Sequence, residues 1–154
     1  MLYQDYSCET CRRFATNSSY LDSIRKKYVE SGTARLIWKF YPGDSIEDEV
    51  LLECVHRHSP ESFDRSRRVL LGDDQAAENL NSLGVYEQIR IQECRNSRSA
   101  RQDVRLQKNI GSRLGINRTP GMIIDDKEPG SYWYTSGLAT PQKYDELIRG
   151  ALTG

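Results

Sequence analysis

The first forty residues combine a strand pattern with a helix pattern. Residues 2–6 are short and aromatic, which predicts a strand. Apolar side chains then recur at helical spacing, and Gly32 follows as a terminator, so one helix is expected here. The members of this apolar stripe are Phe14, Leu21, Ile24, Tyr28 and Val29. Residues 34–41 predict a second strand, which the turn signal Pro42-Gly43 closes.

The middle of the chain, residues 46–114, has a helical pattern throughout. Its apolar positions predict five consecutive helices rather than strands. They are Val50, Leu51, Cys54 and Val55 on the first, Phe63, Val69, Leu70 and Leu71 on the second, Leu80 and Leu83 on a weaker third, Ile89, Ile91 and Cys94 on the fourth, and Val104, Leu106, Ile110 and Leu114 on the fifth. The second helix should begin at Ser59-Pro60-Glu61, because proline is favoured in the first helical turn.

The pattern returns to strands after Gly115. Residues 121–124 and 131–135 predict two strands joined by a turn-rich loop. Thr140-Pro141 should cap a final helix that buries Tyr144, Leu147, Ile148 and Leu152. The predicted order is therefore β-α-β, a helical block, and then β-β-α, which indicates an α/β fold.

Composition excludes some classes of protein. The 154 residues contain 22 Lys plus Arg and 22 Asp plus Glu, so the formal net charge is zero. A nucleic-acid-binding protein would carry a basic excess, and no nucleic-acid partner is expected. No apolar run approaches the roughly 18 residues of a membrane span, and no charged start followed by a hydrophobic stretch indicates a signal peptide.

The four cysteines carry the candidate chemistry. Cys8 and Cys11 form a CxxC motif, whereas Cys54 and Cys94 stand alone in the helical block. An even number of cysteines is typical of an oxidising compartment, so a periplasmic or other extracytoplasmic location is expected, with the cytoplasm as the alternative. The isolated pair could be two buried small side chains or a disulfide. The alternative interpretation of the CxxC motif is half of a zinc site, because Cys54, His56 and His58 could supply further ligands.

The position of the CxxC at a strand-to-helix junction favours redox chemistry. A cysteine at a helix N-terminus faces backbone N–H groups and the positive end of the helix dipole, which lower the thiol pKa. Arg12 and Arg13 add positive charge one turn along, and Glu9 opposes them. Cys11 lies one turn further in. We therefore predict that Cys8 attacks a disulfide and that Cys11 resolves the mixed disulfide.

Two motifs give the chain a resemblance to a known family. Residues 5–14, DYSCETCRRF, resemble the strand end, CxxC and following Phe of thioredoxin-fold proteins. Residues 114–121, LGINRTPG, resemble the segment that carries the conserved Thr-Pro of that family. The long helical insertion is similar to the DsbA-like branch. The resemblance implies a thioredoxin fold with a large helical insertion before the final β-hairpin and C-terminal helix. It also implies one domain, 1–154, with its core at 1–44 and 115–154 and the insertion at 45–114.

The resemblance also implies a function. It identifies the chain as a protein dithiol–disulfide oxidoreductase with catalytic Cys8 and Cys11 and no cofactor or metal, because the two thiols are the redox centre. Thr119 and Pro120 are then substrate-binding residues, with the Pro120 peptide cis and facing the CxxC. Cys54 and Cys94 are expected to form a structural disulfide, as in many relatives. The expected partners are cysteine-containing substrate proteins and a redox protein that recycles the Cys8–Cys11 pair.

The sequence departs from the family at two places. Leu2 stands six residues before Cys8, where the superfamily often has a buried carboxylate that handles protons. Proton transfer must then fall to water or another group. The dipeptide between the cysteines is Glu9-Thr10, without the His of the strongest oxidants. A reductase or isomerase of the same fold, and a zinc-binding or structural module, remain the alternatives.

Overall fold

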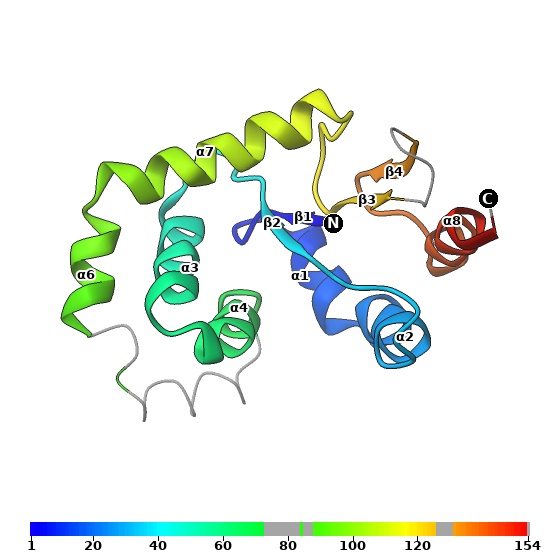
Figure 1. The fold of residues 1–154 in the computed structure, drawn as a ribbon, viewed down its shortest axis with the longest axis horizontal. Helices are drawn as coiled ribbons and strands as arrows, with labels where there is room; N and C mark the ends of the chain where they lie inside the picture. The colour runs from blue at the N-terminus through cyan, green and yellow to red at the C-terminus, as the bar shows by residue number, and fades with distance from the viewer. Residues whose placement is uncertain (73–83, 85–87, 126–130, 154) are drawn as a thin grey trace.

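The computed structural model describes residues 1–72, 84, 88–125 and 131–153, which build a mixed sheet with helices around it (Figure 1). Within these residues the sheet has four strands in the order β2-β1-β3-β4. They are β1 (Leu2–Gln4), β2 (Trp38–Phe40), β3 (Gly121–Asp125) and β4 (Tyr132–Ser136). β1 runs parallel to β2 and antiparallel to β3, and β3 pairs antiparallel with β4. The arrangement confirms the β-α-β and β-β-α halves that the sequence predicts.

The two N-terminal strands are shorter than predicted. Leu2 pairs with Trp38 and Gln4 with Phe40, so the ladder spans only three residues. Residues 5–6 leave the strand because the chain turns there toward the CxxC. Residues 34–37 have the apolar composition of a strand but lie beyond the start of β1. Over the described segments of the chain, their bond to β1 is the one from Leu2 N to Ile37 O at 2.8 Å.

The prediction of a single helix between Phe14 and Gly32 is wrong, because the helix is interrupted in the middle of this segment. α1 (Glu9–Thr16) ends before Asn17, and α2 (Leu21–Ile24) continues as a π-helical turn, η1 (Arg25–Val29). At the break, the side chain of Asn17 accepts a hydrogen bond from the backbone N–H of Ser19 at 2.9 Å. Such local side-chain bonds compete with the helix for backbone groups. The apolar residues on both sides of the break still face one core.

The middle of the chain forms the predicted helical block. It contains α3 (Glu47–His58), a short 3-10 turn, η2 (Pro60–Ser62), then α4 (Phe63–Leu70), α6 (Ile89–Arg95) and α7 (Arg98–Arg113). Pro60 therefore opens the 3-10 turn and α4 begins at Phe63. The expected third helix, with Leu80 and Leu83, lies outside the described residues.

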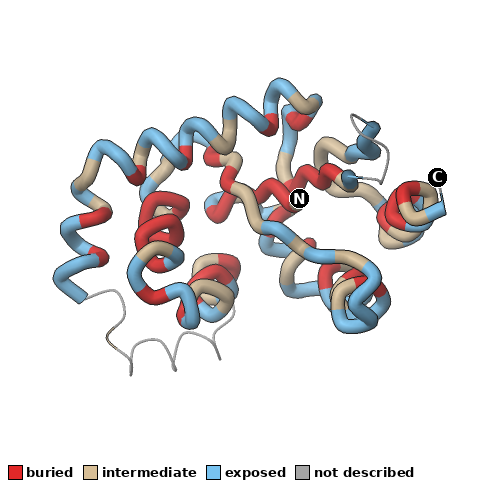
Figure 2. Tube along the Cα trace, in the orientation of Figure 1, coloured by how far each residue is buried: buried red, intermediate tan, exposed pale blue. Residues whose placement is uncertain are grey.

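The apolar residues of α7 do not share one face, contrary to the simple pattern. Val104 is buried, whereas Leu106 and Ile110 are exposed. The buried stripe instead joins Ala100 and Val104 to Gly111, and it faces inward along the whole helix (Figure 2). The helix begins with Ser97, whose Oγ accepts from Ala100 N at 3.3 Å. It ends before Gly115, whose φ of +92° is the left-handed conformation common after a helix.

Helices cover both faces of the sheet. On one face, Leu2 of β1 and Met122 of β3 pack with α1, α2 and the final helix, α8 (Pro141–Thr153). Thr140 caps α8, since its Oγ1 accepts from Lys143 N at 3.2 Å. On the other face, Tyr3 and Ile123 pack near the end of α7. A third apolar cluster joins the start of α1 to the helical block and includes Tyr6, Cys11, Phe40 and residues of α3, α4, α6 and α7.

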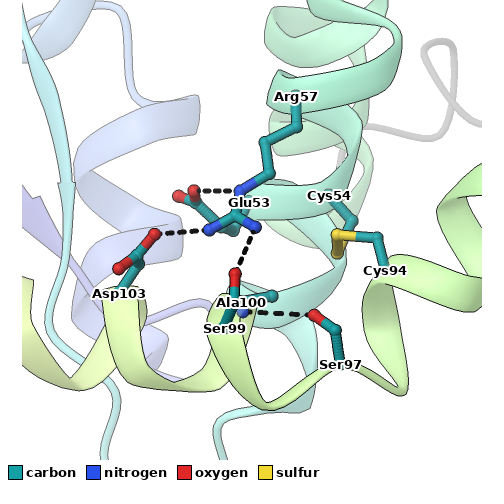
Figure 3. The surroundings of a disulfide bond; sticks show 8 residues. All are labelled: Glu53, Cys54, Arg57, Cys94, Ser97, Ser99, Ala100 and Asp103. Atoms are coloured by element: carbon teal, nitrogen blue, oxygen red, sulfur yellow. Dashed lines mark hydrogen bonds and ion pairs between the residues drawn. A yellow bond between two sulfur atoms is a disulfide. The ribbon is translucent and has the colours of Figure 1, made fainter.

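A disulfide and an arginine tie the helical block together (Figure 3). Cys54 of α3 and Cys94 of α6 are bonded. Beside them, Arg57 donates to Glu53 at 2.8 Å and to Ser99 at 2.9 Å, and it also pairs with Asp103. Because these partners lie on α3 and α7, the guanidinium and the disulfide together join α3, α6 and α7.

Candidate active site

The start of α1 positions the two cysteines of the CxxC motif. Cys8 is the N-cap residue in an extended conformation, and its carbonyl accepts from Arg12 N at 3.1 Å. Ahead of it, the Asp5 carboxylate accepts from the Ser7 backbone N–H at 2.9 Å and from the Ser7 hydroxyl at 2.6 Å. These bonds form the tight turn between β1 and α1. In the first helical turn, the backbone N–H groups of Thr10 and Cys11 act on the Cys8 sulfur and help to lower its pKa.

The two thiols have opposite environments. Both are free, but Cys8 is partly exposed and Cys11 is fully buried. Burial acts to raise the pKa of Cys8, but the Thr10 hydroxyl, the Cys11 and Thr10 N–H groups and Thr119 outweigh it, and the pKa is lowered. Burial raises the pKa of Cys11 to about 12, against opposing contacts with Asp5 and Thr119. Of the two sulfurs, Cys8 is therefore the more accessible one and the one that loses its proton more readily.

The loop before β3 lies against the Cys8 sulfur. Its Thr119–Pro120 peptide is cis, and the Thr119 carbonyl oxygen is 3.9 Å from Cys8 Sγ. Pro120 is buried and Thr119 is partly exposed. The cysteine motif and the Thr-Pro motif are 111 residues apart in sequence, and the antiparallel pairing of β1 with β3 brings them to one end of the sheet.

Ser136 and Gly121 hold that loop in place. The Ser136 hydroxyl, at the end of β4, accepts from Asn117 N at 2.8 Å and from Arg118 N at 2.9 Å, and it donates to Asn117 Oδ1 at 2.8 Å. One hydroxyl therefore uses all three of its hydrogen-bonding positions on the loop. Gly121 follows Pro120, and a Cβ there would lie 2.7 Å from Ile116 Cγ2, so the close approach requires glycine.

Thr10 connects the helix to the loop. Its Oγ1 is 2.9 Å from Cys8 Sγ and donates to the Thr119 carbonyl at 3.0 Å. Sequence reasoning noted Thr10 only as part of the dipeptide between the cysteines. A hydroxyl residue inside a CxxC is visible in the sequence, but its contact with residue 119 requires the fold.

Glu49 is a second residue that the sequence does not single out. It lies on α3, is only 2% exposed, and accepts a hydrogen bond from the Tyr6 backbone N–H at 3.0 Å. Burial raises the pKa of Glu49 to about 7, and the nearby Asp5 and Asp48 add to this while the Tyr6 N–H opposes it. A buried carboxyl therefore does support the segment before the CxxC, although Leu2 occupies the position where the family often has one.

The remaining predicted residues lie apart from this site. Cys54 and Cys94 are bonded to each other in the helical block, so Cys54 has no thiolate to offer a metal. His56 and His58 are exposed at the end of α3. Among the residues that the structure describes, no group of three or more His, Cys, Asp and Glu side chains could hold a metal ion. The disulfide therefore removes Cys54 from the further ligands considered for a zinc site at Cys8 and Cys11.

Within the described part of the chain, none of the helices combines the length and the hydrophobicity of a membrane-spanning segment.

Comparisons with known proteins agree with this geometry. A family model described as Thioredoxin matches residues 1–148. The structure of alpha-DsbA1 from Wolbachia pipientis is 18% identical and superposes with a TM-score of 0.77, covering 99% of this chain and 84% of that one. A thioredoxin-like oxidoreductase from Silicibacter pomeroyi DSS-3 is 14% identical, with a TM-score of 0.73 and coverage of 99% and 85%.

A further solved structure, Pseudomonas aeruginosa DsbA2, is 17% identical, with a TM-score of 0.72 and coverage of 97% and 85%. No curated protein matches the sequence. At these identities the solved structures show the fold, and they share the thioredoxin core with its helical insertion.

Proposed function

This chain belongs to the thioredoxin family, and from that premise we propose that it is a DsbA-like protein dithiol–disulfide oxidoreductase whose redox centre is Cys8 and Cys11. The observation that carries the proposal is the asymmetry of the two thiols. Cys8 is partly exposed with a lowered pKa, and Cys11 is buried with a pKa raised to about 12. A nucleophile that meets substrate and a shielded partner that acts second need these two environments.

The reaction follows from this asymmetry. The Cys8 thiolate attacks one sulfur of a substrate disulfide, and the other substrate sulfur leaves as a thiolate. Cys11 then gives up its proton to water and attacks the Cys8 sulfur of the mixed disulfide, which expels the second substrate thiolate. Two electrons have passed to the substrate, and Cys8 and Cys11 are joined. The reverse sequence oxidises a substrate dithiol and leaves Cys8 and Cys11 reduced.

Thr119 is the proposed contact for the substrate backbone. Its carbonyl lies next to Cys8 and its residue is partly exposed, while Pro120 is buried behind it. An extended segment of a cysteine-containing protein could pair with this carbonyl through its backbone N–H groups, as in strand addition. A separate redox protein is then required to restore the Cys8–Cys11 pair after each cycle.

Two further proposals concern the whole chain. We propose that residues 1–154 form a single DsbA-like domain, with the core at 1–44 and 115–154 and the insertion at 45–114. The Cys54–Cys94 disulfide supports an oxidising, extracytoplasmic location, where such bonds persist.

The test is thiol–disulfide exchange with purified protein. The wild type should catalyse reduction of insulin by dithiothreitol or isomerisation of a scrambled disulfide substrate. Cys8→Ser should abolish exchange, and Cys11→Ser should accumulate a mixed disulfide that non-reducing electrophoresis detects. An inactive wild type would refute the proposal. The reduction potential of the Cys8–Cys11 pair against glutathione then distinguishes an oxidase from a reductase or isomerase.

A further inference from the structure

The Thr10 hydroxyl lies between two groups that compete for its single proton. Its Oγ1 is 2.9 Å from Cys8 Sγ and 3.0 Å from the Thr119 carbonyl oxygen, whereas Cys8 Sγ is 3.9 Å from that carbonyl. A hydroxyl has one O–H donor and two acceptor lone pairs. Thr10 can therefore donate to the sulfur or to the carbonyl, but not to both.

The protonation state of Cys8 decides between these two arrangements. When Cys8 is a thiol, its S–H can donate to Thr10 Oγ1, and the Thr10 hydroxyl can donate onward to the Thr119 carbonyl. When Cys8 is a thiolate, its sulfur can only accept. The Thr10 hydroxyl should then rotate toward the sulfur, because a hydrogen bond to a charged acceptor is stronger than one to a neutral carbonyl.

We propose that Thr10 is a positioning residue whose hydroxyl couples deprotonation of Cys8 to release of the Thr119 carbonyl for the substrate backbone. The inference rests on the proposed function. It adds a mechanism by which the Cys8 site becomes ready to bind and attack a substrate disulfide. The Cys8 proton leaves to water, the Thr10 hydroxyl turns to the thiolate, and the carbonyl loses its intramolecular donor. The nucleophile and the carbonyl that would bind an extended substrate thus become available together.

The surroundings agree with this role. Burial acts to raise the pKa of Cys8, and the Thr10 hydroxyl is the foremost of the contacts that lower it. Thr10 is itself partly buried on the first turn of α1, and its hydroxyl bridges the helix to a loop 109 residues away in sequence. Ser136 accepts from the backbone N–H groups of residues 117 and 118 of that loop independently of Thr10, so rotating one hydroxyl need not displace the loop.

The first measurement is the thiolate fraction of Cys8. Absorbance at 240 nm across pH is compared between wild type, Thr10→Val and Thr10→Ser, with Cys11→Ser in the background of all three. Valine keeps the shape and removes the hydroxyl, so at a fixed pH below the Cys8 pKa its thiolate fraction should fall about tenfold. Serine should keep the wild-type value. Thr16→Val is the matched control, because Thr16 lies on the same helix and its hydroxyl donates to the Arg12 carbonyl at 2.9 Å, away from Cys8 and Thr119.

The second measurement tests the release of the carbonyl. A neutral peptide with Ser in place of its cysteine is titrated into the reduced proteins by calorimetry. Wild-type affinity should rise roughly two- to tenfold as pH passes through the Cys8 pKa, since one backbone hydrogen bond becomes available. Thr10→Val leaves the carbonyl without this donor at every pH, so its affinity should stay constant.

The outcomes separate this inference from the proposed function. A Thr10→Val thiolate fraction equal to that of wild type overturns the inference, and so does a wild-type peptide affinity that does not change with pH. Either result leaves exchange activity, and hence the oxidoreductase proposal, intact. An inactive wild type overturns the oxidoreductase proposal whatever Thr10 does.

Discussion

Glu49→Gln is the perturbation whose effect on stability can be worked out most directly from the structure. The Glu49 side chain is 2% exposed, and its Oε1 accepts from Tyr6 N at 3.0 Å, two residues before Cys8. Burial raises the pKa of Glu49 to about 7 from its ordinary value of 4.5. Glutamine has nearly the same shape and can still accept the Tyr6 N–H, but it carries no charge at any pH.

The sign of the effect follows from proton binding. Between about pH 4.5 and pH 7 the folded protein keeps a proton on Glu49, whereas the unfolded chain has released it. The free energy of unfolding therefore falls as pH rises through this window. The folded and unfolded pKa values of Glu49 differ by about 2.5 (7 minus 4.5), and each pKa unit corresponds to about 1.36 kcal/mol. The free energy of unfolding should therefore fall by about 3 kcal/mol, and this fall is complete above pH 7. Glu49→Gln should not show this loss.

Urea unfolding at pH 4.5 and at pH 8, followed by circular dichroism, measures the difference. The wild type should lose about 3 kcal/mol more between the two pH values than Glu49→Gln does. Any disturbance of the Tyr6 bond by the amide would shift both values equally and cancel in this comparison. Glu146→Gln, on the exposed surface of α8, is the control and should follow the wild type. Parallel pH dependences for wild type and Glu49→Gln would refute the reasoning.

Three further predictions concern the cysteines and the loop beside them. Iodoacetamide at pH 7 should label Cys8 and spare Cys11, because only Cys8 combines exposure with a lowered pKa; a label on Cys11 in the peptide map would reverse the assigned roles. Replacing Cys54 and Cys94 together with Ala should lower the Tm by about 8–16 °C, since closing their 40-residue loop is worth about 4 kcal/mol, while exchange activity persists. An unchanged Tm in calorimetry contradicts that estimate. Ser136→Ala removes the acceptor of two loop N–H groups and should slow exchange, with amide NMR shifts concentrated at residues 117–120.

The order of elements could be predicted from the sequence because hydrophobic period and turn residues are local signals. Helix continuity could not be predicted so well. The apolar stripe through Phe14 and Leu21 survives the break at Asn17, since both residues reach the same core from two separate helices. On α7 the helix is continuous, but the predicted buried face is wrong. Leu106 and Ile110 have the apolar side chains of core residues, yet they lie on the surface, and the smaller Ala100 is buried. Periodicity registers apolar residues and does not show which face meets a neighbour.

The candidate site likewise contains residues that the sequence predicts and residues that it does not. Cys8, Cys11 and the Thr119-Pro120 motif were found from spacing and from a family resemblance, because their residue types are unusual together. Glu49 and Ser136 could not be predicted, since a glutamate in the acidic first turn of a helix and a serine at the end of a strand are common in protein sequences. Their roles depend on contacts between residues far apart in sequence. Glu49 contacts a residue 43 positions away, and Ser136 contacts residues 18 and 19 positions away.

Glu49 and Ser136 also explain how a strand of only three residues can hold the Cys8 sulfur in a defined position. β1 ends at Gln4, and the segment that follows is held from three sides: by the Asp5 turn, by Glu49 on α3, and through Thr10 by the loop that Ser136 holds. The helical block therefore contributes to the site directly, through the backbone of Tyr6, as well as by covering Cys11. If Glu49 is protonated at neutral pH, its bond to the Tyr6 N–H becomes one between neutral groups, which is weaker than a charge-assisted one. The turn before Cys8 should then be held more loosely below about pH 7, where Glu49 is protonated, than above it.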